Sequence, residues 1–135
     1  MQIGEVAERT GLSLRTIRYY EEVGLVVPSA RSTGGFRLYA EADVSRLMVV
    51  KQMKPLEFSL DEMRDLLAVL DALDTEPDVD ARAGLLDRLV MYRQAADERC
   101  KALRAQLDTA EEFAGSLRRQ TARQRRIMRS AGSGS

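Results

Sequence analysis

The chain of 135 residues is 44% hydrophobic and 31% charged, with 21 basic and 21 acidic side chains; this composition argues against disorder and predicts one compact domain with a further element. It contains no apolar run of about 18 residues and no basic-then-apolar leader, so we expect a cytoplasmic protein without a membrane partner. With one cysteine and no histidine, an intrachain disulfide and a histidine-dependent triad are excluded, and we expect no metal and no cofactor.

Two short helices joined by a tight turn are predicted at the start of the chain. Apolar residues recur at helical spacing from Ile3 to Ala7, and Gly11 is placed to end this helix. Ser13 is placed to cap a second helix, which we expect from about Leu14 to Val23. Two short helices with a glycine turn are typical of a helix-turn-helix.

A small β-hairpin is predicted after this motif. The stretch from Ser29 to Tyr39 contains Gly34 and Gly35 between two short segments, and we interpret it as a wing. A further helix with an apolar inner face is expected from about Glu41 to Met53.

The next helix has a strong start signal. Ser59 and Glu62 form a capping box, and Phe58 and Met63 occupy the two positions of a hydrophobic staple. We therefore expect a helix from Leu60 to about residue 73. Residues 1–73 are predicted to form a winged helix-turn-helix DNA-binding domain.

Acidic side chains gather in the middle of the chain. Residues 55–80 hold one basic and nine acidic side chains, so a basic face remains possible elsewhere despite the zero net charge. Residues 74–80 are predicted to form an exposed acidic linker. At the other end, residues 118–129 carry six arginines and no acid, and we expect residues 121–135 to form a basic, flexible tail.

A long helix is predicted over residues 81–120, where apolar residues step by three or four positions and form a seam with one stutter. This seam needs a partner, so we expect a homodimer. The chain is thus predicted to be mainly α, with the winged domain followed by a coiled-coil helix. The predicted dimerisation residues are Leu85, Leu89, Tyr92, Ala96, Cys100, Leu103, Leu107, Ala110 and Leu117.

Basic and hydroxyl side chains lie on the predicted second helix and on the wing. Arginine binds guanine edges or phosphates, and serine, threonine and tyrosine hydroxyls bind phosphate oxygens. A glycine tip lets the wing lie close to a DNA backbone. Double-stranded DNA is therefore the predicted partner, contacted by Ser13, Arg15, Thr16, Arg18, Tyr19, Arg31, Gly35, Arg37 and Tyr39.

Four segments resemble the signature of the MerR family, the mercury-resistance type of bacterial regulator. They are residues 3–13 (IGEVAERTGLS), 16–25 (TIRYYEEVGL), 35–39 (GFRLY) and 58–63 (FSLDEM). The resemblance implies a homodimer joined by an antiparallel helix, which binds promoter DNA and bends and untwists the spacer so that RNA polymerase engages both promoter elements. It adds Tyr20 to the DNA-binding residues. Two assignments have a second interpretation, namely Tyr20 as a core residue and Arg37 as a brace of the wing.

Departures from the family pattern limit what the resemblance implies. Glu57 stands where many relatives have glycine, and a positive φ there would cost roughly 1 kcal/mol. The cysteines of metal-sensing and redox-sensing relatives are absent, and a separate ligand domain has no room. The resemblance therefore implies neither a metal nor a dedicated effector domain.

Other functions remain as alternatives. Cys100 is interpreted as a small apolar seam residue, or else as a thiol sensor of oxidants or electrophiles. A protein-interaction adaptor that uses the coiled coil is a second alternative. An enzyme is not expected, because neither a phosphate-binding glycine loop nor a recognisable pair of catalytic carboxylates is found.

Overall fold

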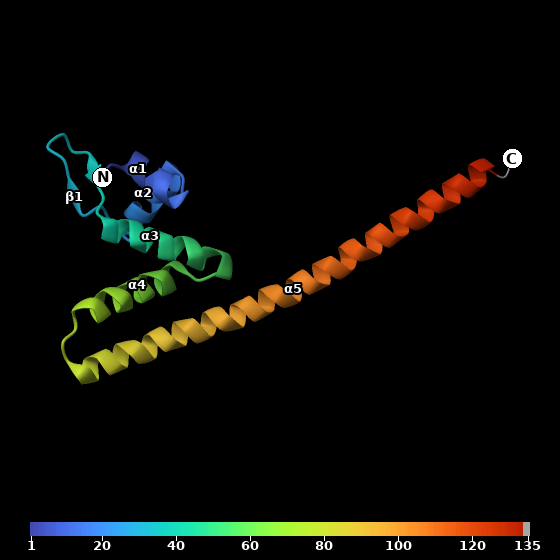
Figure 1. Cartoon of the computed structure of the whole chain (residues 1–135). Coiled ribbons are helices and arrows are strands. Elements are labelled where there is room, and N and C mark those ends of the chain that lie inside the picture. Colours follow the sequence, from blue (N-terminus) through green and yellow to red (C-terminus); the bar gives the residue numbers. More distant parts are fainter. Residues whose placement is uncertain (134–135) are drawn as a thin grey trace. The chain divides into compact units, whose positions relative to one another are not determined.

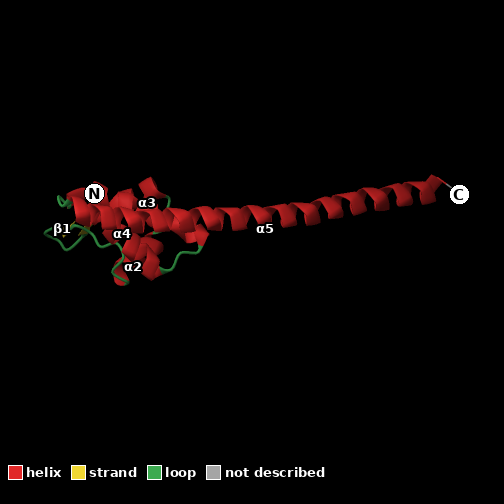
Figure 2. Cartoon of the chain, turned by 90° about the horizontal axis from the view of Figure 1, so that it is seen from below, coloured by secondary structure: helices red, strands yellow, loops and turns green. Residues whose placement is uncertain are grey.

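The computed structural model describes residues 1–133, in which most of the chain is helical (Figures 1 and 2). Its contacts divide it into a head, Met1–Gln94, and a terminal helix that begins at Ala95. Within residues 1–133, no helix is both long enough and apolar enough to cross a membrane. The elements are α1 (Ile3–Thr10), α2 (Leu14–Glu22), β1 (Ala30–Arg31), β2 (Arg37–Leu38), α3 (Glu41–Met53), the 3-10 helix η1 (Lys54–Leu56), α4 (Leu60–Thr75) and α5 (Val79–Ser133).

The predicted helix-turn-helix is confirmed, and its turn is held by local chemistry. Gly11 has a φ of 73°, and its N–H donates to the Ala7 carbonyl at 2.9 Å, a left-handed helix end that suits glycine. The Lys51 ammonium from α3 donates to the Thr10 carbonyl at 2.6 Å. The Ser13 hydroxyl oxygen accepts the Thr16 N–H at 3.1 Å and caps α2.

The core of the head lies where α1, α2, α3 and α4 meet. Its fully buried side chains come from each of these helices and include Val6, Ile17, Leu47, Val50 and Val69. Burying each such side chain contributes about 1.5–3 kcal/mol relative to exposure. This core buries one face of α2 and leaves the opposite face of the helix in solvent.

The wing is also confirmed, and a buried carboxylate anchors its base to α3. Strands β1 and β2 are antiparallel, with Ala30 opposite Leu38. Asp43 is buried, and its carboxylate accepts the Ser29 hydroxyl at 2.6 Å and the Ala40 N–H at 2.8 Å. The Arg46 guanidinium donates to the same carboxylate at 3.2 Å. Without Asp43 or water the Ser29 hydroxyl and the Ala40 N–H would lack this acceptor, whereas Arg46 also pairs with Asp71 at 3.0 Å.

The turn between η1 and α4 follows the prediction. Glu57 has a φ of 61°, the one non-glycine residue with a positive φ within residues 1–133. The Ser59 hydroxyl oxygen accepts the Glu62 N–H at 3.1 Å, and the Glu62 carboxylate accepts the Ser59 N–H at 2.9 Å. The predicted capping box is therefore confirmed, with Phe58 and Met63 buried beside it.

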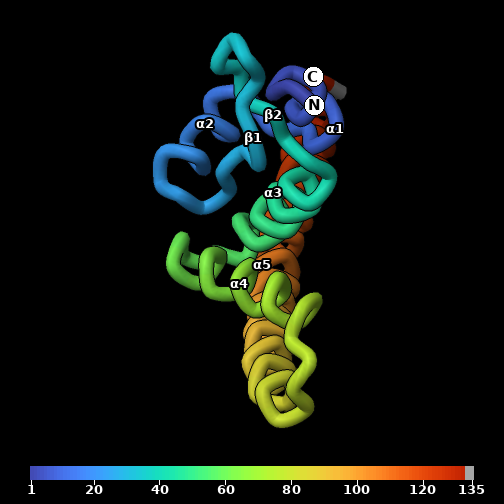
Figure 3. Tube along the Cα trace, turned by 90° about the vertical axis from the view of Figure 1, so that its left-hand side faces the viewer, coloured from blue at the N-terminus to red at the C-terminus, as the bar shows by residue number. Residues whose placement is uncertain are grey.

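The start of α5 belongs to the head and runs antiparallel to α4 (Figures 1 and 3). The Tyr92 hydroxyl donates to Asp65 at 2.6 Å, Arg88 pairs with the same carboxylate, and the Tyr92 ring lies 6.2 Å from that of Phe58. Three residues, 76–78, join the two helices, so the predicted linker of residues 74–80 is too long.

The far end of α5 corrects another prediction. The helix continues to Ser133, so the flexible tail expected over residues 121–135 is wrong for 121–133, while residues 134 and 135 lie outside the described chain. Between residues 118 and 131 the sequence is rich in arginine, glutamine, alanine and methionine, all good helix formers, and glycine first returns at Gly132. Charge alone therefore misled the prediction.

Candidate DNA-binding surface

Helix α2 presents a basic outer face. Ile17, which is fully buried, and Tyr20, which is 3% exposed, point inward, whereas Arg15, Arg18 and Tyr19 are exposed. Among residues 1–133 neither of these two arginines has an ion-pair or hydrogen-bond partner. The face therefore offers two guanidinium groups and a tyrosine hydroxyl to an external acceptor, the combination that binds phosphates and guanine edges.

The first turn of α2 adds two hydroxyl groups. Ser13 donates to the Thr16 hydroxyl oxygen at 2.9 Å while capping the helix, and Thr16 is half-buried. Both lie beside Arg15 on the same turn. Their prediction as DNA-binding residues is compatible with their positions, and the capping role of Ser13 is established independently of DNA.

The wing is fixed to α2 through one carboxylate. Glu21 pairs with Arg31 at 2.8 Å and with Arg37, and Arg31 also donates to the Gly35 carbonyl at 3.3 Å. The hydrogen bond that Arg37 donates to the Glu21 carboxylate raises the pKa of Arg37 above its usual value. Figure 3 shows the hairpin beside α2. The contacts of Arg37 support its interpretation as a brace, which sets where the exposed Gly35 tip lies.

Two predicted contact residues are instead core residues. Tyr20 is 3% exposed and Tyr39 is 2% exposed, so neither side chain is available to DNA in this structure. Burial raises the pKa of both phenols. Tyr20 lies three positions after Ile17 and so shares its inward face. The buried Tyr39 hydroxyl has no hydrogen-bond partner within residues 1–133.

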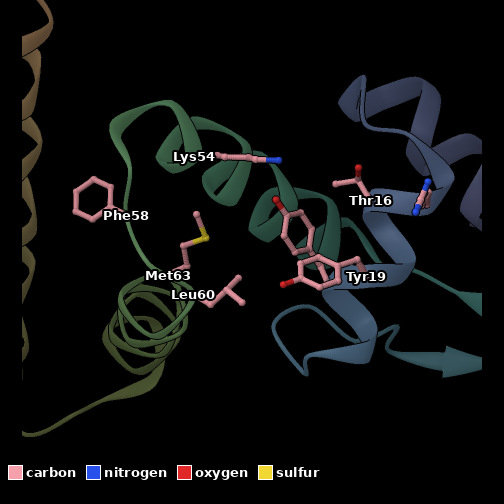
Figure 4. A pocket seen from close by; sticks show the side chains of 8 residues that line it. Thr16, Tyr19, Lys54, Phe58, Leu60 and Met63 are labelled. Carbon is pink, nitrogen blue, oxygen red and sulfur yellow. The ribbon is translucent and has the colours of Figure 1, made fainter.

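Sequence reasoning missed two residues of this surface. The Arg64 guanidinium from α4 donates to the Val23 carbonyl at 2.7 Å and holds the end of α2. Lys54 from η1 lies with Arg15, Thr16 and Tyr19 around a cavity of about 490 Å³, shown in Figure 4. Both residues are distant in sequence from α2, and no motif marks either one. Only the tertiary fold brings η1 and the start of α4 close to α2.

The predicted seam of α5 falls into two parts. Leu103, Leu107 and Leu117 are 43%, 56% and 51% exposed in the single chain, and Ala110 is also exposed. The earlier seam residues are half-buried: Leu85, Leu89, Tyr92, Ala96 and Cys100. Tyr92 is already engaged with α4. Dimerisation through these residues remains a prediction. It is best supported for the seam residues of the terminal helix from Leu103 onward, because these are the exposed ones.

The sequence matches the model of the MerR HTH family of regulatory proteins over residues 1–70. The transcriptional regulator HmrR of Rhizobium leguminosarum is 46% identical over 74 residues, which are 55% of this chain and 57% of that protein. The transcriptional regulator CueR of Yersinia pestis is 33% identical over 115 residues, covering 85% of this chain and 82% of CueR.

Among solved structures, a putative MerR family transcriptional regulator from Listeria monocytogenes is 31% identical, with a TM-score of 0.61 over 82% of this chain and 80% of that one. The chain spans about half the length of several curated relatives that it matches. The family match covers the helix-turn-helix, the wing, α3 and most of α4, and the likeness to CueR extends into α5. The chain belongs to the MerR HTH family of regulatory proteins.

Proposed function

We propose that this protein is a sequence-specific transcriptional regulator that binds double-stranded promoter DNA as a homodimer. The observation that carries the proposal is the outer face of α2, where Arg15, Arg18 and Tyr19 are exposed and both arginines lack partners in the described chain. A helix of this kind beside a braced wing fits the major groove, while the wing lies along the backbone. The regulators HmrR and CueR, which are similar in this region, support the same assignment.

The dimer is supported by the exposed seam of the terminal helix. Leu103, Leu107 and Leu117 would be buried by the same seam of a second copy. The charge pattern favours antiparallel pairing: residues 71–80 hold five acids and no base, and residues 118–129 hold six arginines and no acid. Parallel copies would place like charges together, whereas antiparallel copies place the basic end of one near the acidic segment of the other.

A dimer of this kind carries two copies of α2 to successive major-groove half-sites, about one DNA turn or a multiple apart. We infer that binding bends and untwists the spacer between promoter elements, at a cost of about 1–6 kcal/mol that phosphate contacts offset. The target of this change is RNA polymerase at the same promoter. Because promoter DNA is the partner, the proposed place of action is the cytoplasm.

The first test identifies the DNA. Genomic fragments that the full chain retains would be selected, sequenced and footprinted. The expected result is a pseudo-palindrome between two promoter elements. Random fragments with no shared sequence would contradict sequence-specific binding.

The second test separates base contacts from phosphate contacts. Arg18→Ala should weaken binding to the selected site by about 1–3 kcal/mol and leave unrelated DNA little affected if Arg18 contacts a base. Arg93→Ala, which removes an exposed arginine from α5, is the matched control and should change neither. An equal loss on both DNAs would show that Arg18 contacts phosphate only.

A further inference from the structure

The cavity beside α2 is large enough for a small molecule. Its volume of about 490 Å³ lies within the range of about 300–1,000 Å³ that is usual for ligand pockets. Arg15, Thr16 and Tyr19 line it from α2, and Lys54, Leu60 and Met63 line it from η1 and α4. Every lining residue belongs to the head, so the cavity lies within one compact unit.

The wall of this cavity is mainly apolar and aromatic. Figure 4 shows the side chains of Tyr19, Leu60 and Met63 directed toward a common space, while the Phe58 ring points away from it. The Tyr19 and Tyr20 rings lie 5.8 Å apart and form an aromatic wall on the α2 side. Leu60 and Met63 lie one helical turn apart on α4 and form the opposite wall. The lining therefore offers apolar contacts from both sides of the cavity.

The charge at this cavity is positive. The Arg15 guanidinium and the Lys54 ammonium both belong to the lining, and no aspartate or glutamate does. Neither cation has an ion-pair or hydrogen-bond partner in the part of the chain that the structure describes. Two such cations beside an apolar wall favour a ligand that carries both an acidic group and an apolar body.

We propose that this cavity binds a small organic anion, an aromatic or alkyl carboxylate or sulfonate, whose acidic group lies between Arg15 and Lys54. A bare phosphate would satisfy the cations but would make no apolar contact with Leu60 and Met63. Regulation by this ligand rests on the proposed function, because Arg15, Thr16 and Tyr19 belong to the face that binds DNA. A bound anion removes these residues from DNA, so ligand and DNA compete.

The direct test uses the full chain without DNA. Anilinonaphthalene sulfonate is the probe, and phenylnaphthylamine, the same apolar body without the sulfonate, is its neutral control. The six methionines include one in the cavity, Met63, and two exposed on α5, Met91 and Met128. Isotope-labelled methionine methyl groups, assigned with Met63→Leu, report by NMR which of these sites the probe approaches.

The expected result is a saturable shift of the Met63 resonance, with the sulfonate binding about tenfold more tightly than the neutral probe. Sodium phosphate at the same concentration should leave Met63 unshifted. Shifts confined to Met91 and Met128 would place the probe on α5 and overturn the proposal. Equal affinity for both probes would overturn the role of the cations.

Two variants test separately the cation and the apolar lining of the cavity. Lys54→Gln should reduce the preference for the sulfonate over the neutral probe by about tenfold. Lys101→Gln, at an exposed position on α5, should leave this preference unchanged. Leu60→Asp introduces a carboxylate at the first residue of α4, a position that tolerates acidic side chains, and should abolish binding while helicity is retained. Sulfonate binding unchanged in both variants would contradict the site.

Competition with DNA is measured separately. A duplex retained in the selection experiment should be displaced as the sulfonate saturates the Met63 shift, and phenylnaphthylamine should displace it less. If DNA binding is absent, the proposed function fails while the NMR shift still stands. If both bind together without competition, the cavity is a ligand site that does not regulate DNA binding through α2, and the competitive mechanism is overturned.

Discussion

The head and the terminal helix meet their physical requirements in different ways. In the head, apolar side chains such as Val6, Ile17 and Leu47 are fully buried by the chain itself, and the buried carboxylate of Asp43 has its donors. The terminal helix leaves Leu103 and Leu107 about half exposed. The head is therefore stabilised by its own residues, whereas the exposed seam of the terminal helix would gain its packing from the proposed second copy.

A charge placed in the seam of the terminal helix should have the largest effect. Leu107→Asp should raise the dimer dissociation constant by on the order of 10²–10⁴, because two leucines per dimer each lose about 1.5–3 kcal/mol of burial. Sedimentation over a range of concentrations measures this effect. Gln106→Asp adds the same charge beside the seam and is the control. If both variants dimerise like the original chain, the seam of the terminal helix is not the interface.

The reciprocal test removes an interaction that the head makes with itself. Asp43→Ala should destabilise the head by about 2–4 kcal/mol, because buried donors lose their acceptor. Denaturant unfolding at several protein concentrations should show a loss that does not depend on concentration. Asp43→Asn keeps an acceptor oxygen and should lose less, and Glu98→Ala, at an exposed pair with Lys101, should change little. A small loss in Asp43→Ala would show that water replaces the carboxylate.

The head is also the region whose structure the sequence predicts best. Gly11, Ser13 and the capping box of Ser59 and Glu62 are local signals, because each residue acts on the backbone within a few positions of itself. Local chemistry therefore predicted where α1, α2 and α4 begin or end. The same reasoning identified Glu57 as a residue that would carry strain if its φ were positive, and it is.

Burial and contacts that depend on residues far apart in the sequence could not be predicted. Tyr20 and Tyr39 combine an aromatic ring with a hydroxyl group, and the residue type alone does not decide whether such a side chain is buried or meets a ligand. Lys54 and Arg64 come close to α2 only in the folded head, because they lie on η1 and α4, which are distant from α2 in the sequence. The seam had the same ambiguity, because helical spacing identifies an apolar face without saying whether α4 or a second copy covers it.

Tyr92 sharpens the boundary between the two regions. Its burial, and then its hydrogen bond to Asp65, raise its pKa from 10.0 to about 12. The unfolded chain therefore loses the phenol proton first, so this stabilisation is complete below pH 10.0 and is lost as the pH rises toward about 12. Tyr92→Phe should lower the free energy of unfolding by about 1–2 kcal/mol at neutral pH.

The difference between Tyr92→Phe and the original chain should then shrink in alkaline solution. Urea unfolding at neutral pH and between pH 10.0 and about 12 measures it, and the ultraviolet absorbance of phenolate follows the titration directly. A difference that stays constant across this interval would mean that Tyr92 is not bound to α4 in solution, and the start of α5 would then belong with the terminal helix.

The smallest expected effect has the opposite sign and tests whether the head carries local strain. Glu57 holds a φ of 61° at the end of η1, a conformation that costs a residue with a Cβ about 1–2 kcal/mol. Glycine removes that cost but gains freedom in the unfolded chain, which offsets about 0.4–1 kcal/mol. Glu57→Gly should therefore stabilise the head by about 0.5–1 kcal/mol. Glu76→Gly makes the same change at a φ of −76° and should destabilise it, because the entropy term remains and the Asp78 N–H loses the Glu76 carboxylate as its acceptor. Denaturation midpoints that move in the same direction for both variants would show that charge, and not backbone conformation, accounts for the change.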